Sequence, residues 1–87
     1  MRVRVPTHLH DYTSGRAEVE LAHVATLGDV LRELDQRYPG LRFRVVDEQD
    51  RIRRHIQFFV AGRVARDLAH PVGEHDEVQI VAALSGG

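Results

Sequence analysis

The sequence predicts an α+β fold in which a mixed four- to five-stranded sheet surrounds one main helix. Short stretches near both ends alternate apolar and polar residues, which is the period-two pattern of half-buried strands. One stretch between them follows the 3.6-residue period of an amphipathic helix. The 87 residues are enough for one small domain, so we expect a single domain over residues 1–87.

The first two predicted strands are joined by a hairpin-like connection. RVRV at 2–5 places its valines on one face and its arginines on the other, and AEVEL at 17–21 repeats the alternation. DYTSG, which lies between them, is rich in turn-forming residues. Pro6 cannot donate a hydrogen bond to a strand ladder, so we expect an edge or a bulge at that position.

The predicted helix spans residues 26–38. Thr26 and Asp29 resemble a capping box, with the acidic residue in the first turn where the helix dipole favours negative charge. Pro39 and Gly40 end the helix. The apolar residues at helical spacing on one face are Leu27, Val30, Leu31, Leu34 and Tyr38.

The second half of the chain supplies the remaining strands. Residues 41–53 are charged and irregular, and we expect a surface connection that can include a short turn of helix. HIQFFVAG at 55–62 predicts a third strand ending in a glycine turn, and RVARDL at 63–68 contains a short strand. DEVQIVAA at 76–83 predicts the last strand.

These elements predict the β-grasp, or ubiquitin-like, arrangement. A two-stranded hairpin cannot by itself bury one face of a helix, so further strands must complete the sheet. The helix connects the opening hairpin to the later strands, and crossovers to a parallel strand are nearly always right-handed. A mixed sheet wrapped around one helix satisfies both conditions.

Composition excludes several classes of chemistry. There is no cysteine, so disulfides, thiolate metal sites and a cysteine nucleophile are excluded. All twelve basic residues are arginine, so no lysine is available as an isopeptide acceptor or a Schiff base. Twelve basic and thirteen acidic residues argue against a dedicated nucleic-acid binder. No long apolar stretch predicts a signal peptide or a membrane span, so we expect a cytoplasmic protein.

The sequence does not predict a metal site. His8 and His10 have a spacing that could chelate an ion from a strand, but no carboxylate or thiolate accompanies them at convincing spacing. No glycine-rich loop precedes a helix, so a phosphate cradle is not predicted either.

Taken together, the segments resemble the ubiquitin-like sulfur carriers of the MoaD/ThiS family. The resemblance covers nearly the whole chain, and the last strand with its terminal Gly-Gly is its most diagnostic part. PTHL…TSG and RRHIQFFVAG look closest to the branch that carries sulfur for cysteine biosynthesis in actinobacteria. The segments that carry the resemblance are VRVPTHL, YTSG, ATLGDVLRELDQRYPGLR, DEQDRIRRHIQFFVAGRVARDL and DEVQIVAALSGG.

This resemblance implies a specific chemistry at Gly87. An E1-like adenylyltransferase would use ATP to adenylate the Gly87 carboxylate, and a sulfurtransferase or cysteine desulfurase would supply sulfur. The product is a thiocarboxylate, 1-thioglycine at Gly87, which gives its sulfur to a biosynthetic enzyme. The protein would then be a cosubstrate of partner enzymes with no cofactor of its own.

The glycines suit this chemistry. Gly86 and Gly87 have no Cβ, so a partner could admit them through a narrow channel and reach the carbonyl from both sides. We expect residues 83–87 to form an extended tail, with Leu84 and Ser85 along the channel walls.

A docking surface is also predicted. Phe59 and Val81 fall on the strand faces opposite the predicted core and could form an apolar patch on neighbouring strands. Single exposed apolar residues are also ordinary, so this pattern alone leaves both interpretations open. Arg63 and Arg66 could steer an acidic partner, or could simply lie on a solvated edge.

Three other functions remain open from the sequence. The protein could be the small subunit of a molybdopterin synthase, with the same tail inserted permanently in a larger subunit. It could be a ubiquitin-like modifier that joins Gly87 to lysines of other proteins. It could also be a binding module in which the terminal glycines are incidental.

Overall fold

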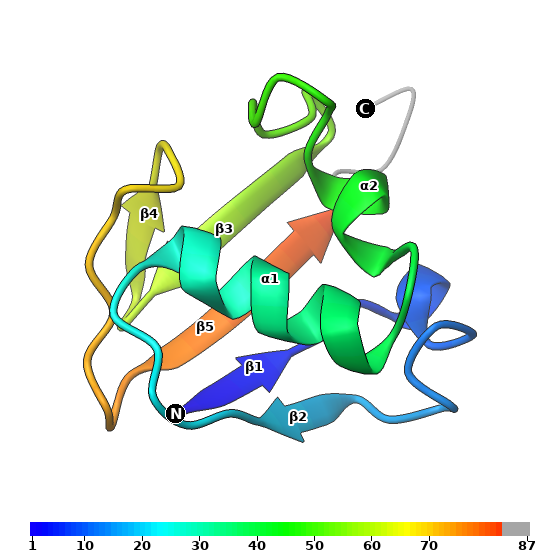
Figure 1. Ribbon diagram of the computed structural model, residues 1–87, viewed down its shortest axis with the longest axis horizontal. Helices are drawn as coiled ribbons and strands as arrows, with labels where there is room; N and C mark the ends of the chain where they lie inside the picture. Colours follow the sequence, from blue (N-terminus) through cyan, green and yellow to red (C-terminus); the bar gives the residue numbers. More distant parts are fainter. Residues whose placement is uncertain (83–87) are drawn as a thin grey trace.

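A computed structural model describes residues 1–82 of the chain, and the predicted tail at 83–87 lies outside them. The described residues form one five-stranded sheet in the order β2-β1-β5-β3-β4, with the main helix α1 lying across one face (Figure 1). The elements are β1 (Arg2–Arg4), the 3₁₀ helix η1 (Thr7–Leu9), β2 (Glu18–Glu20), α1 (Leu27–Arg37), α2 (Leu41–Val45), β3 (Ile56–Val60), β4 (Arg63–Ala65) and β5 (Glu77–Ala82).

The sheet is mixed and confirms the β-grasp prediction. The first and last strands, β1 and β5, run parallel in its centre. Antiparallel pairs flank them, with β2 on β1 and β3 on β5, and β4 extends the sheet beyond β3. The parallel pair forms because α1 crosses one face of the sheet between the opening hairpin and the later strands.

The start of α1 has the predicted capping box. The Thr26 hydroxyl accepts a hydrogen bond from the Asp29 amide at 3.2 Å, and the Asp29 carboxylate accepts from the Thr26 amide at 3.1 Å. The same carboxylate accepts from the Ala25 amide at 2.9 Å. These bonds, first that from Ala25, together with the Arg32 guanidinium, hold the pKa of Asp29 below its usual value.

One apolar core lies between α1 and the sheet. The α1 residues at the predicted spacing are buried, except Tyr38, which is half-buried and packs against the core. Alternation along the strands sends every second side chain inward. The buried strand residues are Val3, Val19, Ile56, Phe58, Val60, Ala65, Val78 and Ile80.

The expectation of a surface connection over 41–53 is only partly correct. Residues 41–45 form α2, and Leu41 and Val45 are fully buried, as is Val46 directly after the helix. Leu41 and Val45 are one helical turn apart and therefore share a face. The intervening arginines obscure this short pattern, so the segment looks more exposed in the sequence than it is.

The β3–β4 hairpin turns at Ala61 and Gly62. Both residues have positive φ, 50° and 81° respectively. Two consecutive left-handed residues are the requirement of a type I′ turn, which matches the twist of the flanking strands. Glycine satisfies this at the second position, whereas the alanine is strained.

Candidate functional site: the end of β5 and its surroundings

The described part of β5 ends at Ala82, and at this end β5 has a strand neighbour on one side only. On one side, β3 begins with Ile56 opposite Ala82. On the other side, β1 ends with Arg4 opposite Gln79. Pro6 lies two positions beyond Arg4 and has no amide hydrogen for the next ladder bond. The predicted edge at Pro6 is therefore where β1 leaves β5.

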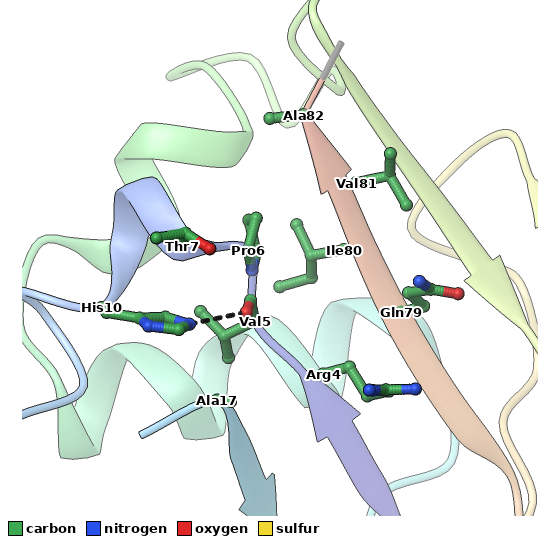
Figure 2. Close-up of a pocket in the computed structure, with 10 residues that line it drawn as sticks. All are labelled: Arg4, Val5, Pro6, Thr7, His10, Ala17, Gln79, Ile80, Val81 and Ala82. Carbon is green, nitrogen blue, oxygen red and sulfur yellow. Dashed lines mark hydrogen bonds between the residues drawn. The ribbon is translucent and has the colours of Figure 1, made fainter. Parts of the chain in front are cut away.

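A shallow groove of about 470 Å³ lies where the two strands part. Figure 2 shows Pro6, Thr7 and His10 on one side of it and the last residues of β5 on the other. His10 Nε2 donates a hydrogen bond to the Val5 carbonyl at 2.9 Å, which ties the segment after η1 back to the end of β1. The groove is lined by Arg4, Val5, Pro6, Thr7, His10, Ala17, Gln79, Ile80, Val81 and Ala82.

The imidazole of His10 has a structural role, because it is hydrogen-bonded to the backbone at the end of β1. Its Nε2 points at the backbone carbonyl of Val5, so this nitrogen is already engaged in the pair that the sequence offered at positions 8 and 10 as a chelate. Among residues 1–82, no group of three or more histidine, cysteine, aspartate or glutamate side chains is placed to hold a metal ion.

An apolar patch lies on the outer face of the sheet. Phe59 lies opposite Val64 across the β3–β4 ladder, and Val81 lies opposite Gln57 across the β3–β5 ladder. Figure 2 shows the Val81 side chain pointing away from that of Ile80, which is buried. Phe59 and Val81 are half-buried, and Val64 is 40% exposed. We call Phe59, Val64 and Val81 the outer-face patch.

Val64 joins the predicted pair of Phe59 and Val81 in the outer-face patch. The two predicted arginines, Arg63 and Arg66, lie outside this patch. Val64 was missed because the RVA stretch is short, although its alternation with Ala65 carries the signal. Arg63 pairs with Val60 across the β3–β4 ladder, so it lies on the face of the sheet opposite to that of Phe59. Arg66 follows the end of β4, and both arginines are exposed at this edge of the sheet.

The other half of the outer face is charged. Arg2 and Arg4 on β1 and Glu18 and Glu20 on β2 are all exposed. The Arg2 and Glu18 side chains form an ion pair at 3.5 Å. The outer face therefore divides into a charged half over β2 and β1 and an apolar half over β3, β4 and the end of β5.

The remaining predicted site residues lie outside the described residues. These are Leu84, Ser85, Gly86 and Gly87. In the sequence they follow Ala82, the last described residue of β5, after one intervening alanine. In residues 1–82, none of the helices combines the length and the apolar character that a membrane crossing would require.

Fold and surface define a ubiquitin-like β-grasp domain whose final strand precedes a Gly-Gly sequence. Comparison with protein families identifies the family to which this domain belongs. The chain belongs to the ThiS family, whose model matches residues 3–87. The resemblance to sulfur carriers of the MoaD/ThiS type is therefore confirmed.

Individual relatives support the same assignment. The chain is 31% identical over 90 residues to the sulfur carrier protein CysO of Mycobacterium tuberculosis, covering 98% of this chain and 96% of the relative. A chain in the crystal structure of the Amycolatopsis orientalis BexX/CysO complex superposes with a TM-score of 0.89 at 29% identity, with 99% and 98% of the two chains covered.

Two further solved structures extend the comparison. Mycobacterium tuberculosis CysO matches with a TM-score of 0.87 at 28% identity, over 95% of this chain and 98% of the other. SAMP1 from Haloferax volcanii matches with a TM-score of 0.76 at 26% identity, over 99% and 97% of the two chains.

Proposed function

We propose that this protein is a sulfur carrier that holds sulfur as a thiocarboxylate on Gly87. The observation that carries the proposal is the likeness to the sulfur carrier protein CysO, which extends over 98% of this chain. The family match also continues through Gly86 and Gly87. Cysteine or another sulfur-containing metabolite would be the product of the pathway that it serves.

The proposed chemistry starts with the Gly87 carboxylate as a nucleophile. It attacks the α-phosphorus of ATP in an E1-like adenylyltransferase, forming an acyl adenylate as pyrophosphate leaves. The terminal sulfur of a persulfide on a sulfurtransferase or cysteine desulfurase attacks the acyl carbon, and AMP leaves with the C–O electron pair. A thiol then cleaves the resulting acyl disulfide, which releases the thiocarboxylate and leaves a disulfide on the donor.

The thiocarboxylate then attacks an activated substrate in a sulfur-accepting biosynthetic enzyme. Subsequent hydrolysis of the acyl–sulfur bond leaves sulfur on that substrate and restores the carboxylate of Gly87. The carrier is thus a protein cosubstrate, and the ATP belongs to the activating partner. A cytoplasmic location suits these partners and stays a prediction.

The described surface supports such a carrier. The end of β5 has strand neighbours on one side only, so a partner can approach the last strand where residues 84–87 begin to follow it. The outer-face patch adjoins this point through Val81. We propose Phe59 and Val81 as docking residues, with Arg63 and Arg66 steering an acidic partner from the neighbouring edge.

A second candidate function is covalent modification of other proteins. It is favoured by the superposition on SAMP1, described as a small archaeal modifier protein. Gly87 would then be joined to a lysine amine of a target protein. Because this chain has no lysine, chains built through its own side chains are excluded. A molybdopterin synthase small subunit is the remaining alternative, and a stable complex with a larger subunit would indicate it.

Intact mass spectrometry tests the proposal. The protein is incubated with the E1-like adenylyltransferase of its source organism, ATP and a persulfide donor. We expect a mass increase equal to the replacement of one oxygen by sulfur, and no increase in a variant lacking Gly87. An unchanged mass for the intact protein, with pathway function retained after Gly87 is deleted, would overturn the proposal. Adducts with lysines of other proteins would favour the modifier function.

A further inference from the structure

The helix side of the molecule carries an exposed aromatic ring near the end of β5. Phe43 on α2 is 55% exposed, more than any residue of the outer-face patch. The burial of Leu41 and Val45 on the opposite face of α2 fixes this orientation. The exposure of Phe43 is thus imposed by the packing of α2.

An arginine from another segment holds this ring in place. The Arg53 guanidinium carbon lies 4.5 Å from the Phe43 ring centroid, and Arg53 Nε donates a hydrogen bond to the Phe43 carbonyl at 2.8 Å. The Arg53 amide also donates to the Val45 carbonyl at 3.0 Å. Because both groups are already ordered, little conformational entropy remains to be lost when a partner binds them.

The segment that carries the ring, residues 41–54, has five arginines and three acidic residues and is therefore net positive. Arg42 pairs with Asp50, and Arg51 pairs with Asp47 at 3.4 Å. The remaining arginines of this surface form no ion pair with any residue of the described part of the chain. Arg53 stacks on Phe43, Arg54 is the exposed residue next to Arg53 in the chain, and Arg44 follows Phe43 on α2 with its guanidinium over the Tyr12 ring. We call Phe43, Arg44, Arg53 and Arg54 the aromatic–arginine platform.

The platform lies at the end of the sheet that holds Ala82. Arg53 and Arg54 come just before β3, and the Ile56 amide donates to the Arg53 carbonyl at 2.9 Å. Ile56 is the residue that pairs with Ala82. In Figure 1, α2 and the segment leading into β3 lie beside the tip of the β5 arrow, on the helix side of the sheet.

We propose that the aromatic–arginine platform is a second docking surface, and that it binds an acidic protein surface beside the tail-receiving channel of the E1-like adenylyltransferase. This inference rests on the proposed function. Carboxylates of the enzyme pair with the platform arginines, and an apolar contact covers Phe43. Aromatic residues and arginine are the side chains most enriched at the energetic centres of protein interfaces.

The outer-face patch and the platform lie on the two sides of the sheet at the end that holds Ala82. The outer-face patch lies on the open side of the sheet, and the platform lies on the side that the helices cover. An enzyme that contacts both encloses the start of the segment that follows Ala82. In this proposal, docking through both surfaces directs Gly87 toward the channel of the enzyme. The affinity of the carrier for the enzyme then comes from the two surfaces as well as from the glycines.

Adenylation kinetics with the purified E1-like enzyme of the source organism test the platform. The readout is AMP or pyrophosphate formation against carrier concentration. For Phe43→Ala we expect KM for the carrier to rise about tenfold with kcat little changed, as for an interface hot spot. Arg54→Gln should raise KM less and weaken its dependence on NaCl, because charged contacts are screened by salt. The charge reversal Arg54→Glu should raise KM more than Arg54→Gln.

Arg16→Gln is the matched control. Arg16 is exposed, forms no ion pair within the described part of the chain and lies outside both surfaces, so this change should leave KM unchanged. Circular-dichroism melts establish that each variant is folded. If wild type is not adenylated at all, the proposed function fails together with the platform.

If wild type is adenylated and the platform variants keep its KM and salt dependence, the platform proposal alone is overturned. The same conclusion follows if these variants lose only the binding of a single-stranded RNA while the KM for adenylation stays constant.

Discussion

The outer-face patch and the aromatic–arginine platform adjoin the same end of β5, but they are built differently. The patch follows from strand alternation, because Phe59 and Val64 face each other across a ladder. The platform depends on a short helix with buried anchors and on an arginine that comes from ten residues further along the chain. A local pattern is thus enough to assign each patch residue to the outer face, whereas the exposure of Phe43 and its contact with Arg53 exist only once the chain is folded.

The two surfaces also differ in charge. The ladder neighbours of Phe59 and Val81 include the neutral residues Gln79 and Gln57. Phe43, in contrast, is stacked by Arg53 and has arginines on both sides of it in the chain, Arg42 and Arg44. Binding at the patch should therefore be mainly hydrophobic, whereas binding at the platform should depend on salt.

The largest expected effect comes from removing an anchor of the platform. Leu41→Ala deletes a fully buried side chain and should lower the free energy of unfolding by about 2–5 kcal/mol. Urea denaturation followed by circular dichroism measures the change. Phe43→Ala on the same helix is the matched control, because Phe43 is exposed and its removal should cost only the contact with Arg53, about 0.5–1 kcal/mol. Equal losses for the two variants would contradict this account of α2.

Truncating the patch should weaken docking in a different way from truncating the platform. Phe59→Ala should raise KM for adenylation about tenfold, by the same factor at low and at high NaCl. Steady-state kinetics at several salt concentrations provide the comparison with Arg54→Gln. If the rise in KM for Phe59→Ala disappeared at high NaCl, binding at the patch would depend on charge, and the proposed difference between the two surfaces would be wrong.

A smaller change should stabilise the hairpin that carries the patch. Ala61 has a φ of 50°, which is unfavourable for alanine but is tolerated by asparagine. Ala61→Asn creates the Asn-Gly pair preferred in type I′ turns and should stabilise the fold by up to about 1 kcal/mol. Thermal unfolding measures this effect. Ala69→Asn, at an exposed position without positive φ, is the control and should bring no such gain.

The smallest effect should appear at low pH in the segment that joins α2 to β3. Amide hydrogen bonds from Arg51 and Gln49 and the Arg51 guanidinium hold the pKa of Asp47 below its usual value. Because the folded-state pKa is the lower one, this contribution to stability is fully present above the ordinary value of 3.8 and is lost as pH falls through the folded-state pKa.

Hydrogen exchange of the Gln49 and Arg51 amides should therefore quicken in acid, beyond the change in intrinsic rate. In Asp47→Asn this additional pH dependence should be absent. The pKa of Asp29 is lowered in the same direction, so the amides of Ala25 and Thr26 report a parallel change at the start of α1. Persistence of the effect at Gln49 in Asp47→Asn would assign it to another group.

The sequence predicted the elements with the clearest periodicity. The α1 helix, its capping box and most inward strand residues lie where the patterns indicated. The prediction was wrong at Ala17, which was expected to face inward but is exposed just before β2. The sequence allowed a short turn of helix over 41–53 but missed that this helix, α2, is anchored in the core. Two buried residues separated by three others give too short a pattern, and two of those three are arginine. It also missed Val64, whose strand has only three residues. The roles of Gly86 and Gly87 were predicted from resemblance, and they stay predictions.

By itself, the sequence determined which side chains of each strand and of α1 face the core, because these periods are properties of a single segment. It also set the available chemistry, with no thiol, no lysine amine and a Gly-Gly end. Only the tertiary structure decided that Arg53 stacks on Phe43, and that Arg53 bonds to Ile56, the residue that pairs with Ala82. The stacking and the strand pairing join segments distant in the chain, and their geometry is set by packing against a shared core.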